Sequence, residues 1–417
     1  MTDLSHKKVL ISAYACRPHM GSEAEVGWSM AREIAKYCQV WVVTRSDNRP
    51  AIEAELAQQP DLNFQFIYHN LPWTRWWNLG VQLHYYLWQF KTYGLIRQLN
   101  REIGFDLIHH VTYVKYWSPS FLALLPIPFI WGPVGGAESA PKSFYQDWTI
   151  RGKLYENLRN AARRLGEYDP FVRLTAMRSQ WAGATTTETA ERLRCLGATQ
   201  VCITSEAGLS REEIAGFSQM PTPADSPFRL ISMGRLLHWK GFHLGLQAFA
   251  AAHFPAPAEY WIVGQGPEFG RLQSLARRLG IEHQVKFWGQ LPRSEALRRV
   301  QECHILIHPS LHDSGGWVCL EAMAMGRAVI CLDLGGPQIQ VIDATGIKVA
   351  ARSPQQAVSD LAEAMVRLGR DGALRKRLGD SGQQRVRDYY NWTAKGQYWA
   401  QCYADILNDG KLNDGKL

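Results

Sequence analysis

The stretch His308–Pro337, HPSLHDSGGWVCLEAMAMGRAVICLDLGGP, decides the fold. The apolar run Ile305–Ile307 leads into it and predicts a buried strand, and a second such run, Ala328–Leu332, follows inside it. Between the two runs, the polar and glycine-bearing loop Asp313–Gly316 precedes a short apolar helix that Gly326 ends. A strand, a loop, a helix and a strand in this order predict a unit of a parallel α/β sheet.

The loop after the first of these strands is a predicted anion site. It lies at the carboxyl end of its strand, where open α/β sheets bind ligands. Free backbone N–H groups at Gly316, Trp317 and Val318 would point at the ligand, and the helix dipole favours an anion there. Asp313 and Glu321 form a D-x7-E spacing, with one acid on each side of the site. We therefore expect a ligand with a phosphate in the middle and hydroxyls at both ends, such as a nucleotide sugar.

This stretch resembles the E-x7-E signature of glycosyltransferase family 4, a large retaining family with the two-domain GT-B fold. The glycine three residues after the first acid is present as Gly316, and the closing E-A-M-A-x-G motif is Glu321–Gly326. The first acid, Asp313, is one methylene shorter than the usual Glu, which would alter its contact to the sugar or tighten the loop. The resemblance implies an α/β GT-B protein, with two Rossmann-like doubly wound domains facing a central cleft.

The chain has 417 residues, which is enough for two domains of about 200 residues each. We expect an acceptor-side domain over 1–208 and a nucleotide-sugar-binding domain over 209–389. A proline-containing segment, Gly208–Phe228, is predicted to be the interdomain linker together with the entry to the second domain. The resemblance implies that a helix over about 390–408 returns to the first domain, with Trp392, Trp399 and Tyr403 spaced to bury. The remaining tail, 409–417, is expected to be disordered.

Composition limits the class of protein. The net charge of +8 makes an anionic partner plausible. We see no nucleic-acid-binding module, and we expect no nucleic acid partner. The eight cysteines are scattered without a C-x-x-C pair, which indicates free thiols in a reducing compartment. The amino-terminal apolar run is too short for a signal peptide, and no run is long enough to span a membrane. The expected location is the cytoplasm.

Two cations are the candidates for holding a diphosphate. Arg235 and Lys240 lie in GRLLHWKG, directly after the predicted strand Phe228–Met233, and match the family pattern G-R-x(4)-K-G. Fixed cations across a cleft can take up charge as a leaving group departs. The competing interpretation is a pair of surface cations with ordinary ionic partners. By resemblance, Glu321 accepts the ribose hydroxyls and Asp313 those of the donor sugar, while Gly289 to Leu291 offer backbone groups to the base.

The first domain gives weaker signals. Ser22 and Glu25 match a capping box at the start of its first helix, and Gly21 precedes them. By resemblance, Gly21 lets substrate approach the backbone, although it is equally well a simple turn residue. His109 and His110 end the predicted strand Asp106–Val111. One of them is expected near the reacting sugar and we favour His110, with a hydrogen-bonded core histidine as the alternative.

Two segments of the first domain suggest contact with a membrane. Residues 72–98 are rich in tryptophan and tyrosine, and Arg151–Arg178 contains seven basic and three acidic residues. We expect most of the aromatic rings to be in the core. The alternative is an exposed patch that touches lipid or a lipid-linked acceptor, together with a basic surface for anionic lipid at the inner face of the membrane.

The sequence predicts a retaining transferase that moves a sugar from a UDP- or GDP-sugar to a hydroxyl of a glycan, a glycolipid or a small molecule. No D-x-D pair, the usual holder of a divalent ion against a nucleotide diphosphate, occurs in the chain. We therefore expect activity without a metal or another cofactor. The alternatives are a nucleotide-sugar epimerase of the same fold, which would need no acceptor, and a non-catalytic protein that binds sugar nucleotides.

Overall fold

The computed structural model describes residues 3–59, 64–71, 80–219, 223 and 226–409. The chain forms two compact units, each of which we describe by itself. The first unit contains Met1–Ala137, Arg159–Gly208 and Trp392–Leu417, and the second contains Glu138–Leu158 and Leu209–Asn391. The predicted tail 409–417 lies outside the described residues from residue 410 onward.

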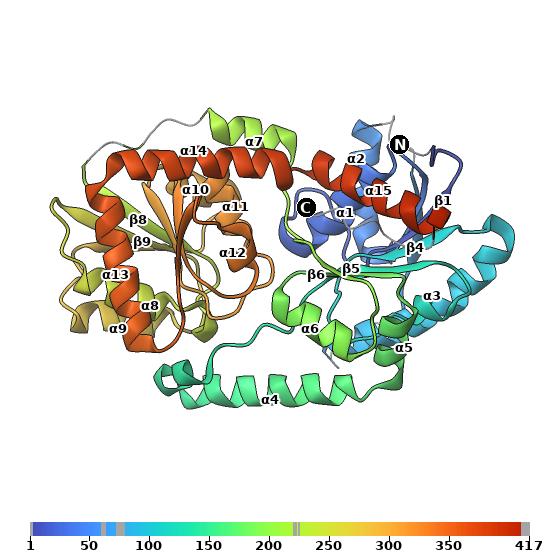
Figure 1. Ribbon diagram of the computed structural model, residues 1–417, viewed down its shortest axis with the longest axis horizontal. Helices are drawn as coiled ribbons and strands as arrows, with labels where there is room; N and C mark the ends of the chain where they lie inside the picture. The colour runs from blue at the N-terminus through green and yellow to red at the C-terminus, as the bar shows by residue number, and fades with distance from the viewer. Residues whose placement is uncertain (1–2, 60–63, 72–79, 220–222, 224–225, 410–417) are drawn as a thin grey trace. The chain divides into compact units, whose positions relative to one another are not determined.

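The first unit is built on a seven-stranded sheet in which every pairing is parallel (Figure 1). Its strand order is β3-β2-β1-β4-β5-β6-β7. The strands are β1 (Lys8–Ser12), β2 (Gln39–Arg45), β3 (Phe64–His69), β4 (Leu107–His110), β5 (Phe129–Val134), β6 (Trp181–Ala184) and β7 (Val201–Ile203). The order reverses between β1 and β4, so loops that follow these two strands lie at a topological switch point.

The helices of the first unit are α1 (Ser22–Ile34), α2 (Arg49–Gln58), α3 (Val81–Ile103), α5 (Pro170–Arg178), α6 (Thr187–Cys195) and α15 (Trp392–Asp409). Trp392, Trp399 and Tyr403 of α15 are all buried, as their spacing predicts. Trp399 packs against Trp181 of β6, and Tyr403 packs against His109 of β4, which fixes the last helix to the first sheet. Helix α4 (Ile150–Glu167) begins in the second unit and ends in the first.

The second unit is built on a six-stranded parallel sheet with the order β10-β9-β8-β11-β12-β13. Its strands are β8 (Phe228–Met233), β9 (Ala258–Val263), β10 (Val285–Gly289), β11 (Ile305–His308), β12 (Ala328–Leu332) and β13 (Gly346–Val349). Its helices are α7 (Arg211–Ser218), α8 (Phe242–Ala251), α9 (Phe269–Arg278), α10 (Arg293–Gln301), α11 (Trp317–Ala324), α12 (Gly335–Gln340), α13 (Pro354–Arg370) and α14 (Gly372–Tyr389). This is the strand order of a dinucleotide-binding doubly wound fold, with the switch point between β8 and β11.

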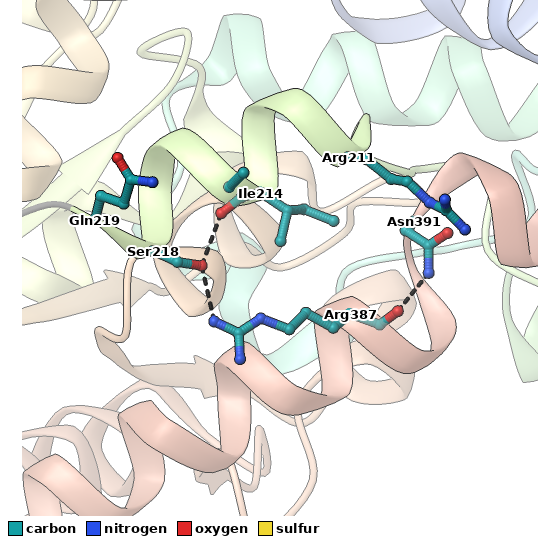
Figure 2. Close-up of a pocket in the computed structure, with 7 residues that line it drawn as sticks. Arg211, Ile214, Ser218, Gln219, Arg387 and Asn391 are labelled. Carbon is teal, nitrogen blue, oxygen red and sulfur yellow. Dashed lines mark hydrogen bonds between the residues drawn. The ribbon is translucent and has the colours of Figure 1, made fainter.

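The segment expected to be the interdomain linker and the entry to the second domain contains helix α7. The Ser210 side chain caps α7 by accepting a hydrogen bond from the Glu213 backbone N–H. The Glu213 carboxylate in turn accepts a hydrogen bond from the Ser210 backbone N–H. Figure 2 shows α7 beside α14, where the Arg387 guanidinium donates to Ser218 Oγ over 2.9 Å. Helix α7 belongs to the second unit, so this part of Gly208–Phe228 is the entry to the second domain.

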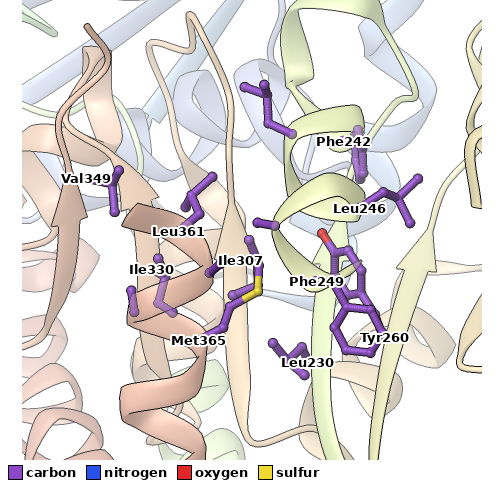
Figure 3. Close-up of a cluster of buried hydrophobic side chains, with 14 of the residues drawn as sticks. Leu230, Phe242, Leu246, Phe249, Tyr260, Ile307, Ile330, Val349, Leu361 and Met365 are labelled. Atoms are coloured by element: carbon purple, nitrogen blue, oxygen red, sulfur yellow. The ribbon is translucent and has the colours of Figure 1, made fainter. Parts of the chain in front are cut away.

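The core of the second unit lies where helices cover the central strands (Figure 3). Phe242, Leu246 and Phe249 of α8 pack with Leu361 and Met365 of α13 on this cluster. Side chains of the strands complete it, and the strand residues that Figure 3 labels are Leu230, Tyr260, Ile307, Ile330 and Val349, which belong to β8, β9, β11, β12 and β13. The continuous apolar runs that predicted buried strands therefore meet helices over the sheet, as a doubly wound fold requires.

One segment belongs to a different unit from the expected one. Glu138–Leu158 falls in the second unit, although the sequence analysis assigned all residues to 208 to the first domain. The physical reason is that Phe144 and Trp148 are buried in the same apolar cluster as Phe242. Arg271 of α9 also donates to the Asp147 backbone carbonyl.

The capping box predicted at Ser22 does not form. Gly21 is the N-cap residue of α1, with a positive φ of 65°, and no side chain caps the helix. Glu25 instead accepts a hydrogen bond from Ser29 Oγ over 2.8 Å, one turn further along the helix. Ser22 itself has a positive φ of 55°, so its side chain is not aligned as a cap.

Candidate active site

Two of the predicted donor residues of the second unit meet beyond the carboxyl ends of β8 and β11. These strands are hydrogen-bonded neighbours, with Ile305 opposite Leu230 and Leu306 opposite Ile231. The chain leaves them toward opposite sides of the sheet, and the two following loops therefore line the crevice at the switch point. Lys240 belongs to the loop after β8, and Asp313 to the loop after β11.

Lys240 and Asp313 form an ion pair. The ammonium Nζ of Lys240 lies 2.5 Å from Oδ2 of Asp313. Both side chains are mostly buried, with 22% and 17% of their surface exposed. The loop backbones approach closely because Gly241 has a φ of 67° and lacks a Cβ, which would lie 1.9 Å from the Pro309 carbonyl oxygen. Spacing in the sequence suggested a shared site, and the structure adds this direct contact.

A histidine that the sequence analysis did not select also contacts Asp313. His308, the last residue of β11, places Nε2 at 3.2 Å from Asp313 Oδ2. Burial alone would raise the pKa of Asp313, but the Lys240 ammonium and then His308 outweigh it and hold that pKa well below its usual range. Asp313 is therefore a carboxylate at neutral pH.

Two hydrogen bonds from residues of α12 hold the loop between Asp313 and α11. Gln340 donates a hydrogen bond to the Gly315 carbonyl over 2.5 Å, and the Gly336 N–H donates to the Asp313 carbonyl over 2.7 Å. Gly316 is the N-cap residue of α11 in the left-handed conformation, with a φ of 53°. The first turn of α11, with Trp317 half-buried and Val318 buried, therefore opens at the edge where an anion was predicted.

Glu321 has a partner that sequence reasoning missed. The Arg293 guanidinium at the start of α10 lies 2.8 Å from Glu321 and 2.8 Å from Glu213 of α7. Burial raises the pKa of Glu321 to about 7, although Arg293 opposes this shift. Arg293 stands two residues after Leu291, and its position at a helix start just beyond the predicted base-binding segment was a signal that could have been used.

The remaining predicted donor residues surround the same edge. Arg235, in the loop after β8, is exposed. Gly289 ends β10 with a φ of 69° and accepts a hydrogen bond from the Gly264 N–H over 2.8 Å. Leu291 is half-buried in the turn before α10. Arg235 thus follows the carboxyl end of β8, and Gly289 lies at the carboxyl end of β10, two strands away in the same parallel sheet.

A buried carboxylate supports the loop that carries Asp313. Glu156 of α4 is fully buried, with Oε1 at 3.1 Å from Nε2 of His312 and 3.5 Å from Nε2 of His238. Trp239 stacks on the His312 ring at 5.1 Å between centroids. The residues next to Asp313 and Lys240 thus share one buried polar centre, which the sequence analysis did not predict because Glu156 is far away in the chain.

The two histidines that the sequence analysis singled out, His109 and His110, are core residues of the first unit. His110 is fully buried, with Nε2 at 2.9 Å from the Tyr85 hydroxyl and 3.1 Å from Gln89 Nε2. His109 is equally buried, between the Tyr403 hydroxyl and the Gly132 carbonyl. Burial lowers the pKa of His110 to about 4 and that of His109 to about 3. Both histidines are therefore neutral and hydrogen-bonded in the structure.

The edge of the first unit contains residues that the sequence analysis passed over. Gly21 lies in the loop after β1, and next to it the carboxylate of Glu23 accepts a hydrogen bond from the Tyr113 N–H. Burial raises the pKa of Glu23. Tyr113 has a φ of 60°, and Ser22 is also in the left-handed region. Strained backbone on non-glycine residues often marks a functional site, which directs attention to the loops after β1 and β4.

One pocket of the second unit is separate from these residues. Figure 2 shows this pocket, of about 420 Å³, between α7 and α14. Its lining residues are Arg211, Ile214, Ala215, Ser218, Gln219, Arg387 and Asn391. None of the predicted donor residues is among them, so the pocket is not the expected nucleotide-sugar site.

Comparison with known sequences identifies the family. The sequence pattern of "Glycosyl transferases group 1" matches residues 217–385. The chain is 30% identical over 266 residues to the lipopolysaccharide core biosynthesis glycosyltransferase LpsE of Rhizobium meliloti, which covers 62% of this chain and 72% of LpsE. This chain belongs to the group 1 glycosyltransferases. Further curated relatives of this glycosyltransferase align over 29% to 64% of their own length.

Solved structures agree on the fold. Sucrose-phosphate synthase from Thermosynechococcus elongatus superposes with a TM-score of 0.67 at 18% identity, over 96% of this glycosyltransferase and 99% of that chain. HepE from Anabaena, solved with UDP and glucose, superposes with a TM-score of 0.60 at 18% identity, over 96% and 100%. The α/β GT-B fold with two doubly wound domains is thereby confirmed for this glycosyltransferase.

Two observations concern metals and membranes. Within the described ranges, no cluster of three or more His, Cys, Asp or Glu side chains is arranged to hold a metal ion. Among the helices of the same residues, none is long and apolar enough to cross a membrane.

Proposed function

We propose that this glycosyltransferase moves a sugar from a nucleoside diphosphate sugar to a hydroxyl group, with retention at the anomeric carbon. The observation that supports it best is the Lys240–Asp313 pair at the switch point of the second sheet, beside the first turn of α11. A cation, a carboxylate and a helix N-terminus at one strand edge match a ligand with a diphosphate between two hydroxyl-bearing groups.

Each residue has a role in this proposal. Lys240 and Arg235 hold the diphosphate and neutralise the charge that develops on it as it leaves. Glu321 accepts the ribose hydroxyls, and Arg293 keeps its carboxylate in place. Asp313 accepts hydroxyls of the donor sugar. Backbone groups of Gly289 and Leu291 face the base, and those of Gly316, Trp317 and Val318 face the phosphates, while Gly21 lets substrate approach the first domain.

The reaction that fits these groups is attack from the front face. The bond between the anomeric carbon and the phosphate oxygen breaks, and the acceptor oxygen forms the new bond on the same side. The proton of the acceptor hydroxyl passes to the leaving phosphate, so the step needs no protein nucleophile. The described geometry supplies positioning and positive charge, which are the contributions that such a step requires.

The first donor to test is UDP-glucose, with GDP-sugars as the alternative. HepE, which has the same fold, was solved with UDP and glucose and also with UDP-glucose. A thermal-shift screen of UDP- and GDP-sugars should identify the donor by a rise in melting temperature, because a ligand stabilises the state that it binds. The same screen with Glu321→Ala should lose most of that rise, because this variant is expected to bind the donor weakly, whereas Lys376→Ala, at an exposed lysine of α14, should keep it.

The acceptor is a hydroxyl of a glycan, a glycolipid or a small molecule, reached from the cytoplasm. The name of LpsE, a lipopolysaccharide core glycosyltransferase, favours a glycolipid. Radiolabelled donor incubated with lipid extracts and with soluble sugars would separate these classes. Turnover of the nucleotide sugar that needs no acceptor would instead indicate an epimerase, and binding without any turnover would indicate a non-catalytic protein.

A further inference from the structure

Helix α4 exposes apolar side chains to solvent and buries charged ones, which is the reverse of an ordinary surface helix. Its apolar residues Ile150, Leu154, Leu158 and Leu165 are 87%, 57%, 63% and 73% exposed. A surface helix of a globular protein ordinarily turns such residues toward the core. At 100° per residue these four positions fall within one sector of about 80°, so they form a single stripe. We refer to these four residues as the α4 stripe.

The opposite face of α4 packs on the protein. Glu156 and Arg163 are buried there, although both are charged. Gly152 and Gly166 allow close approach on the same side: a Cβ on Gly152 would lie 3.1 Å from the His238 ring, and one on Gly166 would lie 2.5 Å from the Trp117 carbonyl oxygen. The polar face is thus held by contacts within the second unit near the amino end of α4, and by contacts within the first unit near its carboxyl end.

Charge on the outer face has one sign. Arg151 borders the α4 stripe on one side, and Lys153 and Arg164 border it on the other. The two acids of the helix are turned away: Glu156 is buried beside His312, and Glu167 accepts a hydrogen bond from the Tyr116 hydroxyl. An apolar stripe bordered by cations and free of carboxylates matches the surface of a bilayer, where apolar acyl chains lie beneath anionic headgroups.

The apolar surface continues beyond the helix. Tyr168 follows α4 and is 78% exposed. Phe171 of α5 and Phe90 of α3 are both partly exposed and both pack on Phe121, at 5.0 and 5.6 Å between ring centroids. The basic segment and the described part of the aromatic segment, which the sequence analysis treated separately, therefore each leave apolar side chains exposed to solvent.

We propose that α4 is a membrane-docking helix that lies in the headgroup region of a bilayer containing anionic lipid. The stripe spans about 22 Å along the helix axis, which suits a helix lying in the plane of the interface. A second copy of the chain is a poorer occupant, because a twofold contact would bring the same three cations against themselves. This inference does not depend on the proposed donor chemistry, because none of the α4 stripe residues is assigned to the donor site.

Co-sedimentation of the full chain with vesicles tests the proposal. Vesicles of phosphatidylcholine with about 30% phosphatidylglycerol should pellet the protein at low salt and release most of it at high salt, and pure phosphatidylcholine should pellet much less. Leu154→Ser with Leu158→Ser should weaken partition about tenfold or more at unchanged charge. Replacing Arg151 and Arg164 by Gln should weaken it about fivefold per cation at low salt.

The matched control replaces two exposed apolar residues outside α4, Ile342→Ser with Tyr389→Ser, and should sediment as the wild type does. Protein that stays in the supernatant with anionic vesicles at low salt would overturn the proposal. Binding that survives the leucine substitutions would also overturn it, because another surface would then be responsible. A dimer in sedimentation velocity that the leucine substitutions convert to a monomer would assign the stripe to a second copy instead.

Discussion

The ammonium of Lys240 lies 2.5 Å from a carboxylate oxygen of Asp313, across the switch point between β8 and β11. In the proposed reaction these two side chains have different partners, the diphosphate for Lys240 and the sugar hydroxyls for Asp313. Each of these mostly buried charges is therefore compensated by the other until the donor binds. A donor that enters between them replaces one ionic contact by another, which lowers the cost of desolvating the phosphate.

Kinetics should separate Lys240 from Glu321. Lys240→Ala should lower kcat by about 100- to 1000-fold, because the lysine meets charge that develops on the leaving phosphate. Glu321→Ala should raise the donor KM by about 10- to 100-fold with a smaller effect on kcat, because ribose contacts act equally before and during the reaction. Steady-state rates with the identified donor decide between them. An unchanged kcat in Lys240→Ala would refute the assigned role.

The same pair should be detectable in stability. Lys240→Met leaves Asp313 mostly buried beside His308 alone, and should cost about 1 to 3 kcal/mol of unfolding free energy. Asp313→Asn with Lys240→Met should cost less than the sum of the two single changes, because residues in contact are coupled. Urea denaturation measures all three variants. Lys376→Met, in the exposed pair with Asp380, is the control and should show no measurable loss. Additive costs would show that the pair contributes nothing.

The second sheet could be predicted from sequence because its strands are continuous apolar runs. Phe228–Met233 and Ala328–Leu332 were predicted with the bounds that the structure gives. Both lie in the middle of a parallel sheet, where burial on both faces makes the run unbroken. Strand β13, Gly346–Val349, was not predicted, because it is short, half-buried and begins with glycine.

Two matches to the capping-box pattern show where local sequence misleads. Ser210 and Glu213 form one, in a segment that its prolines suggested was a linker, whereas Ser22 and Glu25 match the same pattern and do not form one. The difference lies in the backbone, since Ser22 is held at a positive φ beside Gly21. Contacts such as Glu156 with His312 and Arg293 with Glu321 could not be predicted either, because folding alone brings their elements together.

Activity should not depend on a divalent metal. The chain contains no D-x-D pair, and Lys240 and Arg235 are the proposed cations for the diphosphate. Initial rates after dialysis against excess EDTA should equal those of untreated enzyme within error. Loss of activity that added Mg²⁺ or Mn²⁺ restores would contradict this, and a metal-dependent coupling enzyme must be avoided in the assay.

Donor affinity should fall as the pH falls through about 7. The pKa of Glu321 is raised to about 7 from an ordinary value of 4.5, so the folded protein takes up a proton on this group between pH 7 and 4.5. Because the folded state binds this proton more tightly than the unfolded state does, the free energy of unfolding rises as the pH falls through that window. The same proton removes the negative charge that accepts the ribose hydroxyls, so donor binding weakens. Calorimetry should show up to about tenfold weaker binding at pH 6 than at pH 8.

The control for this pH dependence is Glu321→Gln, whose donor affinity should be weaker and flat over the same range. The ligand should be the intact nucleotide sugar. Each of its phosphates carries one ester link and the shared anhydride link, so neither titrates between pH 6 and 8, whereas the terminal phosphate of a free nucleotide does. A wild-type affinity that is constant from pH 6 to 8 would show that Glu321 does not contact the donor in its charged form.

Glu156 should act as a positioning residue for the donor loops. Its carboxylate lies 3.1 Å from His312 and 3.5 Å from His238, the neighbours of Asp313 and of the segment that ends at Lys240. Glu156→Ala should therefore raise the donor KM and lower kcat by several-fold each, since small displacements of the reacting groups are costly. Glu156→Gln keeps an oxygen acceptor and should recover most of both. Asn157→Ala, at the next and exposed position of α4, is the matched control. A Glu156→Ala protein with a lower melting temperature but wild-type kinetics below it would show that Glu156 stabilises the fold without positioning the loops.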